Sequence, residues 1–267
     1  GASGHAFLVN IHDQICPSGP YCWKREAMNP LLANLGLKVA DLGFFMANST
    51  LERRAAVEQQ VREALDTGLP CSLINMENQL IAGYDETGLV VLQPWAPHVD
   101  FPPARLTFGS WTELTDGIHM NFYTWSKREP ASLRIAVIDS LEYAVDIHTN
   151  PEKHTWPRYG VGPNAWALWL KAVEEHGASH GNWWNATVWG ECRAMAAEYI
   201  GIVGREFPQC EGTTALLSQM YRQMADFLAR IAEKELDPSA KVPMLTECAM
   251  LDAEALPLLK KLLVALR

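Results

Sequence analysis

The sequence predicts an α+β protein in two parts, on three observations. Short apolar runs bounded by turn residues occur in the first half and are typical of strands. In the second half, apolar residues recur every three or four positions, as they do on the buried face of a helix. The change of period falls near residues 127–130 and predicts two domains, 1–128 and 129–267.

Four strands are expected in the first domain, over residues 71–75, 80–84, 89–92 and 120–125. Asp85 and Gly88 lie between the second and third of these runs, and a glycine that can adopt positive φ there favours a hairpin. Four prolines between 94 and 103 predict a long loop after the third strand.

The helices follow from apolar spacing and from start signals. An apolar face that includes Trp23 predicts a helix over 20–35, with a kink at Pro30. Ser49 and Glu52 form a capping box that begins a second helix. The five helices expected in the second domain cover residues 132–148, 163–175, 182–203, 213–235 and 253–266.

Composition excludes several classes of protein. The 267 residues carry 31 acidic and 22 basic side chains, a net charge of −9, and 48% of them are hydrophobic. An acidic chain without a basic stripe is not expected to bind nucleic acid. No apolar run reaches roughly 18 residues and no signal peptide opens the chain, so we expect a cytoplasmic protein without a membrane partner. The six scattered cysteines are expected to be reduced thiols, and no cofactor is implied.

The segment from Cys16 to Cys22 contains the sharpest local pattern. Two prolines and a glycine between these cysteines form a turn that brings Cys22 to the start of the predicted helix 20–35. Free backbone amides and the helix dipole there would favour a thiolate, which makes Cys22 the first candidate nucleophile and Cys16 the second. The alternative is that each cysteine is a small buried apolar residue.

A nucleophilic thiolate also needs a base, which is most often a histidine. The first domain offers His5, His12, His98 and His119. His12 could join Cys16 and Cys22 as zinc ligands, but the spacing is not that of a zinc finger and no fourth ligand is evident, so we predict no metal site.

Two further groups of polar residues are candidates for substrate binding. Glu77 and Asn78 stand between two predicted strands, where they either bind a substrate or form a polar turn. In the second domain, Asn182 is a predicted N-cap, and Asn185 then shares a helix face with Trp189. Aromatic and amide groups at a helix start suit a small polar ligand, or else a domain interface.

Four segments carry a resemblance to a known family. They are Gly1-Ala2-Ser3-Gly4-His5-Ala6-Phe7, Leu35-Gly36, Gly68-Leu69-Pro70-Cys71 and Ile81-Ala82-Gly83-Tyr84-Asp85. Through them the chain resembles the papain-like N-terminal domain of the butirosin-biosynthesis protein H family, which is similar to bacteriocin-processing cysteine peptidases. The second half is similar to the helical domain of that family through Trp166, Gly181-Asn182, Asn185, Glu191 and the last Leu-rich helix.

The resemblance implies a papain-like domain followed by an all-helical domain. It also implies acyl transfer or amide hydrolysis through a cysteine thioester, with a histidine base and an orienting Asp or Asn. Three positions depart from the family pattern. The family's nucleophile would precede Gly1, the base position holds Glu77, and the orienting position, before Pro94, holds Gln93.

Three functions are therefore open. In the first, Cys22 or Cys16 acts as nucleophile with His5 as a relocated base, on a small-molecule or acyl-carrier substrate. In the second, a non-catalytic relative binds a small polar ligand between the domains. In the third, the chain acts through protein contact alone. For the first two, the residues expected to line the site from the first domain are Glu77, Asn78 and Gln93, and those from the second are His180, Asn182, Trp183, Asn185 and Glu191.

Overall fold

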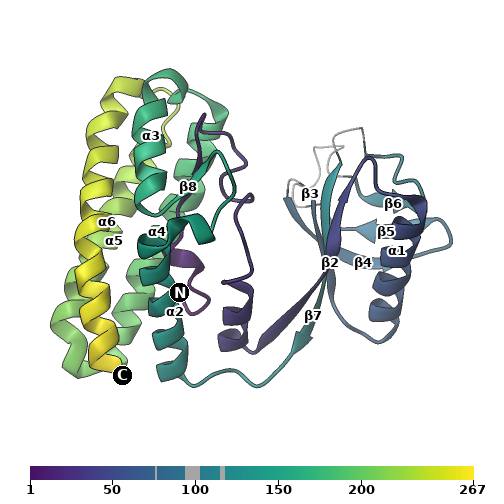
Figure 1. Ribbon diagram of the computed structural model, residues 1–267, viewed down its shortest axis with the longest axis horizontal. Helices are drawn as coiled ribbons and strands as arrows, with labels where there is room; N and C mark the ends of the chain where they lie inside the picture. Colours follow the sequence, from purple (N-terminus) through teal and green to yellow (C-terminus); the bar gives the residue numbers. More distant parts are fainter. Residues whose placement is uncertain (76, 94–102, 115–117) are drawn as a thin grey trace. The chain divides into compact units, whose positions relative to one another are not determined.

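The chain has an α+β architecture in the computed structural model, which describes residues 1–75, 77–93, 103–114 and 118–267 (Figure 1). It forms two compact units. The sheet unit is Gly36–Glu129, and the helical unit combines Gly1–Leu35 with Pro130–Arg267. The later boundary lies next to the predicted one, but the first 35 residues belong with the helices. They do so because Phe7, Leu8 and Val9 are buried in the core of the helical unit.

The sheet unit contains a six-stranded antiparallel sheet with the strand order β2-β7-β3-β4-β5-β6. Its strands are β2 (Leu37–Met46), β3 (Cys71–Asn75), β4 (Glu77–Tyr84), β5 (Gly88–Val91), β6 (Arg105–Thr107) and β7 (His119–Lys127). The four predicted strands and the hairpin are confirmed. Strand β2 was not predicted, because a bulge between Asp41 and Gly43 interrupts its alternation of apolar and polar residues.

The polar stretch that begins at Glu77 belongs to β4 and is not a turn between strands. Asn78 pairs with Ile74 of β3, and the side chain of Gln79 is buried. The predicted loop over 94–103 lies outside the described residues except for Pro103.

Helix α1 (Leu51–Asp66) packs on one face of the sheet. Val57 and Val61 share a core with Phe45 and Phe122 of the strands. The predicted capping box was wrong by one residue, since the N-cap is Thr50, whose side chain accepts a hydrogen bond from the Arg53 amide at 3.3 Å.

Five long helices and a two-stranded ribbon form the helical unit. The helices are α2 (Leu133–Thr149), α3 (Pro163–His176), α4 (His180–Glu206), α5 (Glu211–Ile231) and α6 (Pro238–Leu266). The ribbon pairs β1 (Asn10–His12) with β8 (Tyr159–Val161). This unit also contains the 3-10 helices η1 (His5–Phe7), η2 (Asn29–Leu35), η3 (Pro151–Lys153) and η4 (Pro208–Cys210). All five predicted helices are present. Helix α6 begins 15 residues before its predicted start at 253, because the backbone stays helical through Pro243.

The helix predicted over 20–35 is not formed. Only η2 is helical in this region, and it is a 3-10 helix. The backbone of residues 23–24 instead pairs with the segment after η3. Trp23 forms a bridge with Thr155, and the Lys24 amide donates to the His154 carbonyl at 2.9 Å. These distant backbone partners replace the local bonds that a helix would need.

The turn before Cys16 lies directly on α4. Gly181 of α4 faces the Ile15 carbonyl so closely that a Cβ on this glycine would be 1.9 Å from the oxygen. Ile15 itself has a φ of 50°, which a β-branched residue rarely adopts, and its side chain is buried. Close contact with α4 therefore holds the backbone of this turn.

Replacing Gly181 by alanine should lower the free energy of unfolding by about 1–3 kcal/mol, because the methyl group would collide with a backbone oxygen. Urea unfolding followed by circular dichroism measures the change. Gly212→Ala in α5 is the matched control. No atom lies within 4 Å of the Cβ position there, so alanine should be neutral or stabilise by up to about 1 kcal/mol. Equal stability of the two variants would contradict the packing.

Candidate functional site

A thiol and an imidazole meet in the helical unit. The Sγ atom of Cys192, on α4, lies 3.8 Å from Nδ1 of His5, in η1, which is within hydrogen-bonding distance for sulfur. Both side chains are partly exposed. The histidine proposed as the base therefore contacts a cysteine, but that cysteine was not among the predicted site residues.

Two indole rings lie beside the imidazole of this pair. The His5 ring centroid lies 5.5 Å from that of Trp23 and 6.1 Å from that of Trp189. The guanidinium of Arg25 stacks over Trp23 at 5.1 Å. The imidazole therefore has two tilted indole rings beside it and a cation over one of them.

One face of α4 holds the residues that meet the N-terminal segment. Asn185, Trp189 and Cys192 are spaced four and three residues apart and lie on this face, as predicted for the first two. The Trp189 indole donates to the Asn10 carbonyl at 3.1 Å, and the Asn185 amide donates to the Cys16 carbonyl at 2.9 Å. The helix face that carries Cys192 thus also holds the turn of residues 16–22.

Asn10, in β1, bonds to the inner side of the turn of residues 16–22. Its side-chain amide donates to the carbonyls of Gly19, at 2.7 Å, and Cys22, at 3.1 Å. Asn10 is fully buried and its Oδ1 accepts from the Thr155 hydroxyl at 2.6 Å. The turn therefore has fixed backbone partners along its length.

Cys16 and Cys22 do not form the predicted pair with His5. Among the described residues, neither sulfur has an imidazole within hydrogen-bonding distance. Cys22 instead shares a hydrogen bond with the hydroxyl of Tyr159, which also bonds to Ser18 Oγ at 2.7 Å. Because residues 20–28 contain turns and the bridge at Trp23 but no α-helix, Cys22 does not lie at an α-helix N-terminus, and no helix dipole acts on it there.

The surroundings of His5 and Cys192 keep both groups neutral. Burial lowers the pKa of His5 to about 4, and the charges of Arg25 and Arg193 act in the same direction. Burial raises the pKa of Cys192 to about 11, although the charge of Arg193 opposes this. At neutral pH the thiol is therefore protonated, and it can donate to Nδ1 of an imidazole that carries its proton on Nε2.

A buried polar cluster lies behind the pair. Asp252 of α6 accepts hydrogen bonds from His148 Nε2 and Trp166 Nε1, both at 2.9 Å, and lies 3.6 Å from the Arg193 guanidinium. His148 Nδ1 lies 2.7 Å from the Ala144 carbonyl, so both of its ring nitrogens face acceptors. Burial opposes the charge of His148, but Asp252 and these hydrogen bonds outweigh it and raise its pKa.

The remaining predicted residues of α4 have other surroundings. Asn182 is fully buried, accepts from Trp169 Nε1 at 2.9 Å and donates to the Ile231 carbonyl at 3.1 Å, so it is a core residue. The prediction of Asn182 as the N-cap was wrong, since Ser179 caps α4. The rings of His180 and Trp183 lie 5.1 Å apart and tilted to one another at the start of the helix, and Glu191 is exposed.

Glu77, Asn78 and Gln93 lie in the sheet unit, whereas His5, Cys16, Cys22 and Cys192 all belong to the helical unit. Asn78 is exposed, and the other two are half-buried. The structure therefore assigns the predicted lining residues and the predicted reactive residues to different units.

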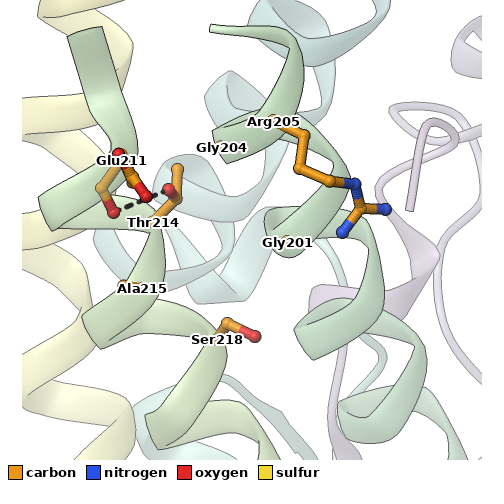
Figure 2. A pocket seen from close by; sticks show the side chains of 7 residues that line it. All are labelled: Gly201, Gly204, Arg205, Glu211, Thr214, Ala215 and Ser218. Carbon is orange, nitrogen blue, oxygen red and sulfur yellow. Dashed lines mark hydrogen bonds between the residues drawn. The ribbon is translucent and has the colours of Figure 1, made fainter. Parts of the chain in front are cut away.

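A shallow groove of about 260 Å³ lies elsewhere on the helical unit, between α4 and α5 (Figure 2). Gly201, Gly204, Arg205, Glu211, Thr214, Ala215 and Ser218 line it. The hydroxyls of Thr214 and Ser218 already donate to carbonyls of α5 and α4, and the Arg205 side chain points away from Thr214. Its polar groups do not converge, and none of the predicted site residues lines it.

Cys192 is the functional candidate that the sequence analysis missed. The available signal was its position three residues after Trp189, on the face already assigned to Asn185 and Trp189. Its partner His5 is 187 residues away in the sequence, so no local spacing connects the two.

Within the described part of the chain, no three His, Cys, Asp or Glu side chains are grouped as metal ligands. No helix among the described residues combines the length and apolar character needed to cross a bilayer. We found no protein-family model and no curated protein that matches this chain.

The high pKa of Cys192 predicts slow alkylation at neutral pH. Its rate with iodoacetamide, measured by peptide mass spectrometry, should keep rising about tenfold per pH unit up to pH 10, because the thiolate forms only near pH 11. In urea the same thiol should level off near its ordinary pKa of about 8.5. A plateau by pH 8 in the folded protein would contradict this environment.

His148 should make stability depend on pH. Because its pKa is raised on folding, its contribution is full below the unfolded value of about 6.5 and is lost as pH rises through the folded value. The stability cost of His148→Gln, from urea unfolding, should therefore be larger at pH 6 than at pH 9. Trp166→Phe removes another donor to Asp252 without an ionising group, and its cost should stay constant over this range. A constant cost for His148→Gln would show that the histidine is neutral.

Proposed function

We propose that this protein catalyses cysteine-dependent acyl transfer or amide hydrolysis, with Cys192 as the nucleophile and His5 as the base. The observation that carries the proposal is the 3.8 Å contact between Cys192 Sγ and His5 Nδ1. A nucleophile within hydrogen-bonding distance of a base is the arrangement that thiol acyl enzymes need.

The neutral state of the pair defines the chemical steps. As the sulfur of Cys192 attacks a bound carbonyl carbon, the thiol proton moves to Nδ1 of His5 and a tetrahedral oxyanion forms. The imidazolium then gives this proton to the leaving amine or alcohol as that bond breaks, which leaves a thioester on Cys192. Water or an acceptor amine next attacks the thioester, gives a proton to His5, and releases the acyl group as the thiol is restored.

The low pKa of His5 has two consequences for this sequence. The imidazole is already free to accept a proton at neutral pH, and once protonated it is a strong acid toward the leaving group. It is a weak base for forming a thiolate before substrate binds, so sulfur attack and proton transfer must occur together.

The proposal includes membership in the butirosin-biosynthesis protein H-like family, with a papain-like fold that the antiparallel sheet and α1 of the sheet unit would contribute to. Glu77 and Gln93 then occupy the family's base and orienting positions without their usual roles, and His5 supplies the base from the helical unit. All six cysteines are free, which fits a reducing compartment such as the cytoplasm.

The neutral resting pair also favours a second candidate function, the non-catalytic binding of a small polar ligand. In that case, the thiol and imidazole are hydrogen-bonding groups, and the rings of Trp23 and Trp189 hold the ligand.

Reaction with p-nitrophenyl acetate at pH 7.5 distinguishes the catalytic function from the binding function. Catalysis predicts release of p-nitrophenolate and an acetyl group on Cys192, located by mass spectrometry. Cys192→Ser should abolish this modification, and His5→Gln should slow it by roughly a hundredfold, the usual effect of losing a general base.

Cys16→Ala and Cys22→Ala are the matched controls, and both should be acetylated on Cys192 at the wild-type rate. Equal acetylation of Cys16, Cys22 and Cys192, or a wild-type rate in His5→Gln, would reject catalysis by this pair. The binding function then predicts thermal stabilisation by small polar ligands that Cys192→Ser leaves unchanged.

A further inference from the structure

We propose that Arg193 is a positioning residue for the pair of Cys192 and His5, an inference that rests on the proposed function. Arg193 follows Cys192 directly on α4. Its Nη1 donates a hydrogen bond to the carbonyl of Ala6, the residue after His5, at 2.8 Å. One side chain therefore connects the helix that carries the thiol to the short 3-10 helix that carries the imidazole.

The burial of Arg193 shows that this connection is costly to maintain. The side chain is almost completely buried, and removing a guanidinium from water is unfavourable unless charges and hydrogen bonds offset the loss. Asp252 lies 3.6 Å from Nη2, and the guanidinium lies 5.6 Å above the Tyr221 ring. A methionine or leucine could fill the same core space without that cost. An apolar side chain could not donate the hydrogen bond that the guanidinium gives to the Ala6 carbonyl.

Arg193 is itself held from several helices. Asp252 comes from α6, and the two groups that bond to this carboxylate, His148 and Trp166, come from α2 and α3. The position of the guanidinium, and through it that of the Ala6 carbonyl, is thus set by the body of the helical unit. Movement of η1 relative to α4 would break the Ala6 bond and separate His5 from Cys192.

The charge of Arg193 supports the same role. It lowers the pKa of Cys192, which favours negative charge on the attacking sulfur, and it lowers the pKa of His5. A residue that only filled the core would leave both values unchanged.

Arg193→Gln and Arg193→Lys in the full chain test the proposal, with Tyr221→Phe as the matched control. Tyr221 is buried in the same cluster, and its hydroxyl has no hydrogen-bond partner among the described residues. Three quantities are measured: the thermal midpoint, the rate of Cys192 acetylation against concentration of p-nitrophenyl acetate, and the pKa of His5 by NMR titration.

In Arg193→Gln that remains folded, we expect the maximal acetylation rate to fall at least tenfold, while the half-saturating ester concentration stays within twofold. The pKa of His5 should rise because a nearby cation is lost. Arg193→Lys should recover much of the rate and keep the pKa of His5 close to the wild-type value, and Tyr221→Phe should match wild type in rate and pKa.

The outcomes separate this inference from the proposed function. If wild type is not acetylated on Cys192, the proposed function fails and the positioning role falls with it. If wild type is acetylated but folded Arg193→Gln reacts at the wild-type rate, only the positioning role is rejected. Unfolding of both Arg193 variants at the assay temperature would also reject it, because Arg193 would then be required for folding and not for orienting the pair.

Discussion

Residues 1–35 are attached to α4 by buried and partly buried hydrogen bonds, and the contact between His5 and Cys192 depends on this attachment. Asn185 and Trp189 of α4 donate to the backbone carbonyls of Cys16 and Asn10, and the Asn10 amide holds the N-terminal segment together through the Gly19 carbonyl. A buried polar group without a partner costs about 1–3 kcal/mol, so these groups tolerate little displacement. These hydrogen bonds fix how the N-terminal segment lies along α4, and the distance between His5 and Cys192 follows from that position.

The charges near His5 differ in sign from the net charge of the chain. The chain as a whole is acidic, but the groups nearest to His5 include the cations Arg25 and Arg193. Burial, assisted by these positive neighbours, lowers the pKa of His5 and keeps the imidazole neutral, and burial raises the pKa of Cys192 and keeps the thiol protonated. An ion pair of thiolate and imidazolium would require solvent or charge compensation that this environment does not provide, so a substrate must supply the driving force for proton transfer.

The parts of the fold that depend on local pattern could be predicted from the sequence. Apolar spacing located all five long helices of the helical unit, because each buries one continuous face. It failed for residues 20–35, where Trp23 and Lys24 bond to Thr155 and His154 of a distant segment, and for β2, where the bulge at Asp41 changes the alternation. The glycine-rich start, together with the family resemblance, indicates His5 as a candidate base, but the sequence does not indicate its partner Cys192. The two residues are 187 positions apart, and their contact depends on how η1 packs on α4. No local sequence pattern around either residue indicates this packing.

The first and last strands of the sheet unit, β2 and β7, are neighbours in the sheet. Leu37 pairs with Lys127, and the Arg128 amide donates to the Gly36 carbonyl at 2.9 Å, so both ends of this insertion are tied together within the insertion itself. Because the two ends of the sheet unit lie side by side, a short linker in place of residues 37–127 would leave residues 35 and 130 of the helical unit close together. His5, Cys192 and Arg193 all belong to the helical unit, so such a deletion removes none of them.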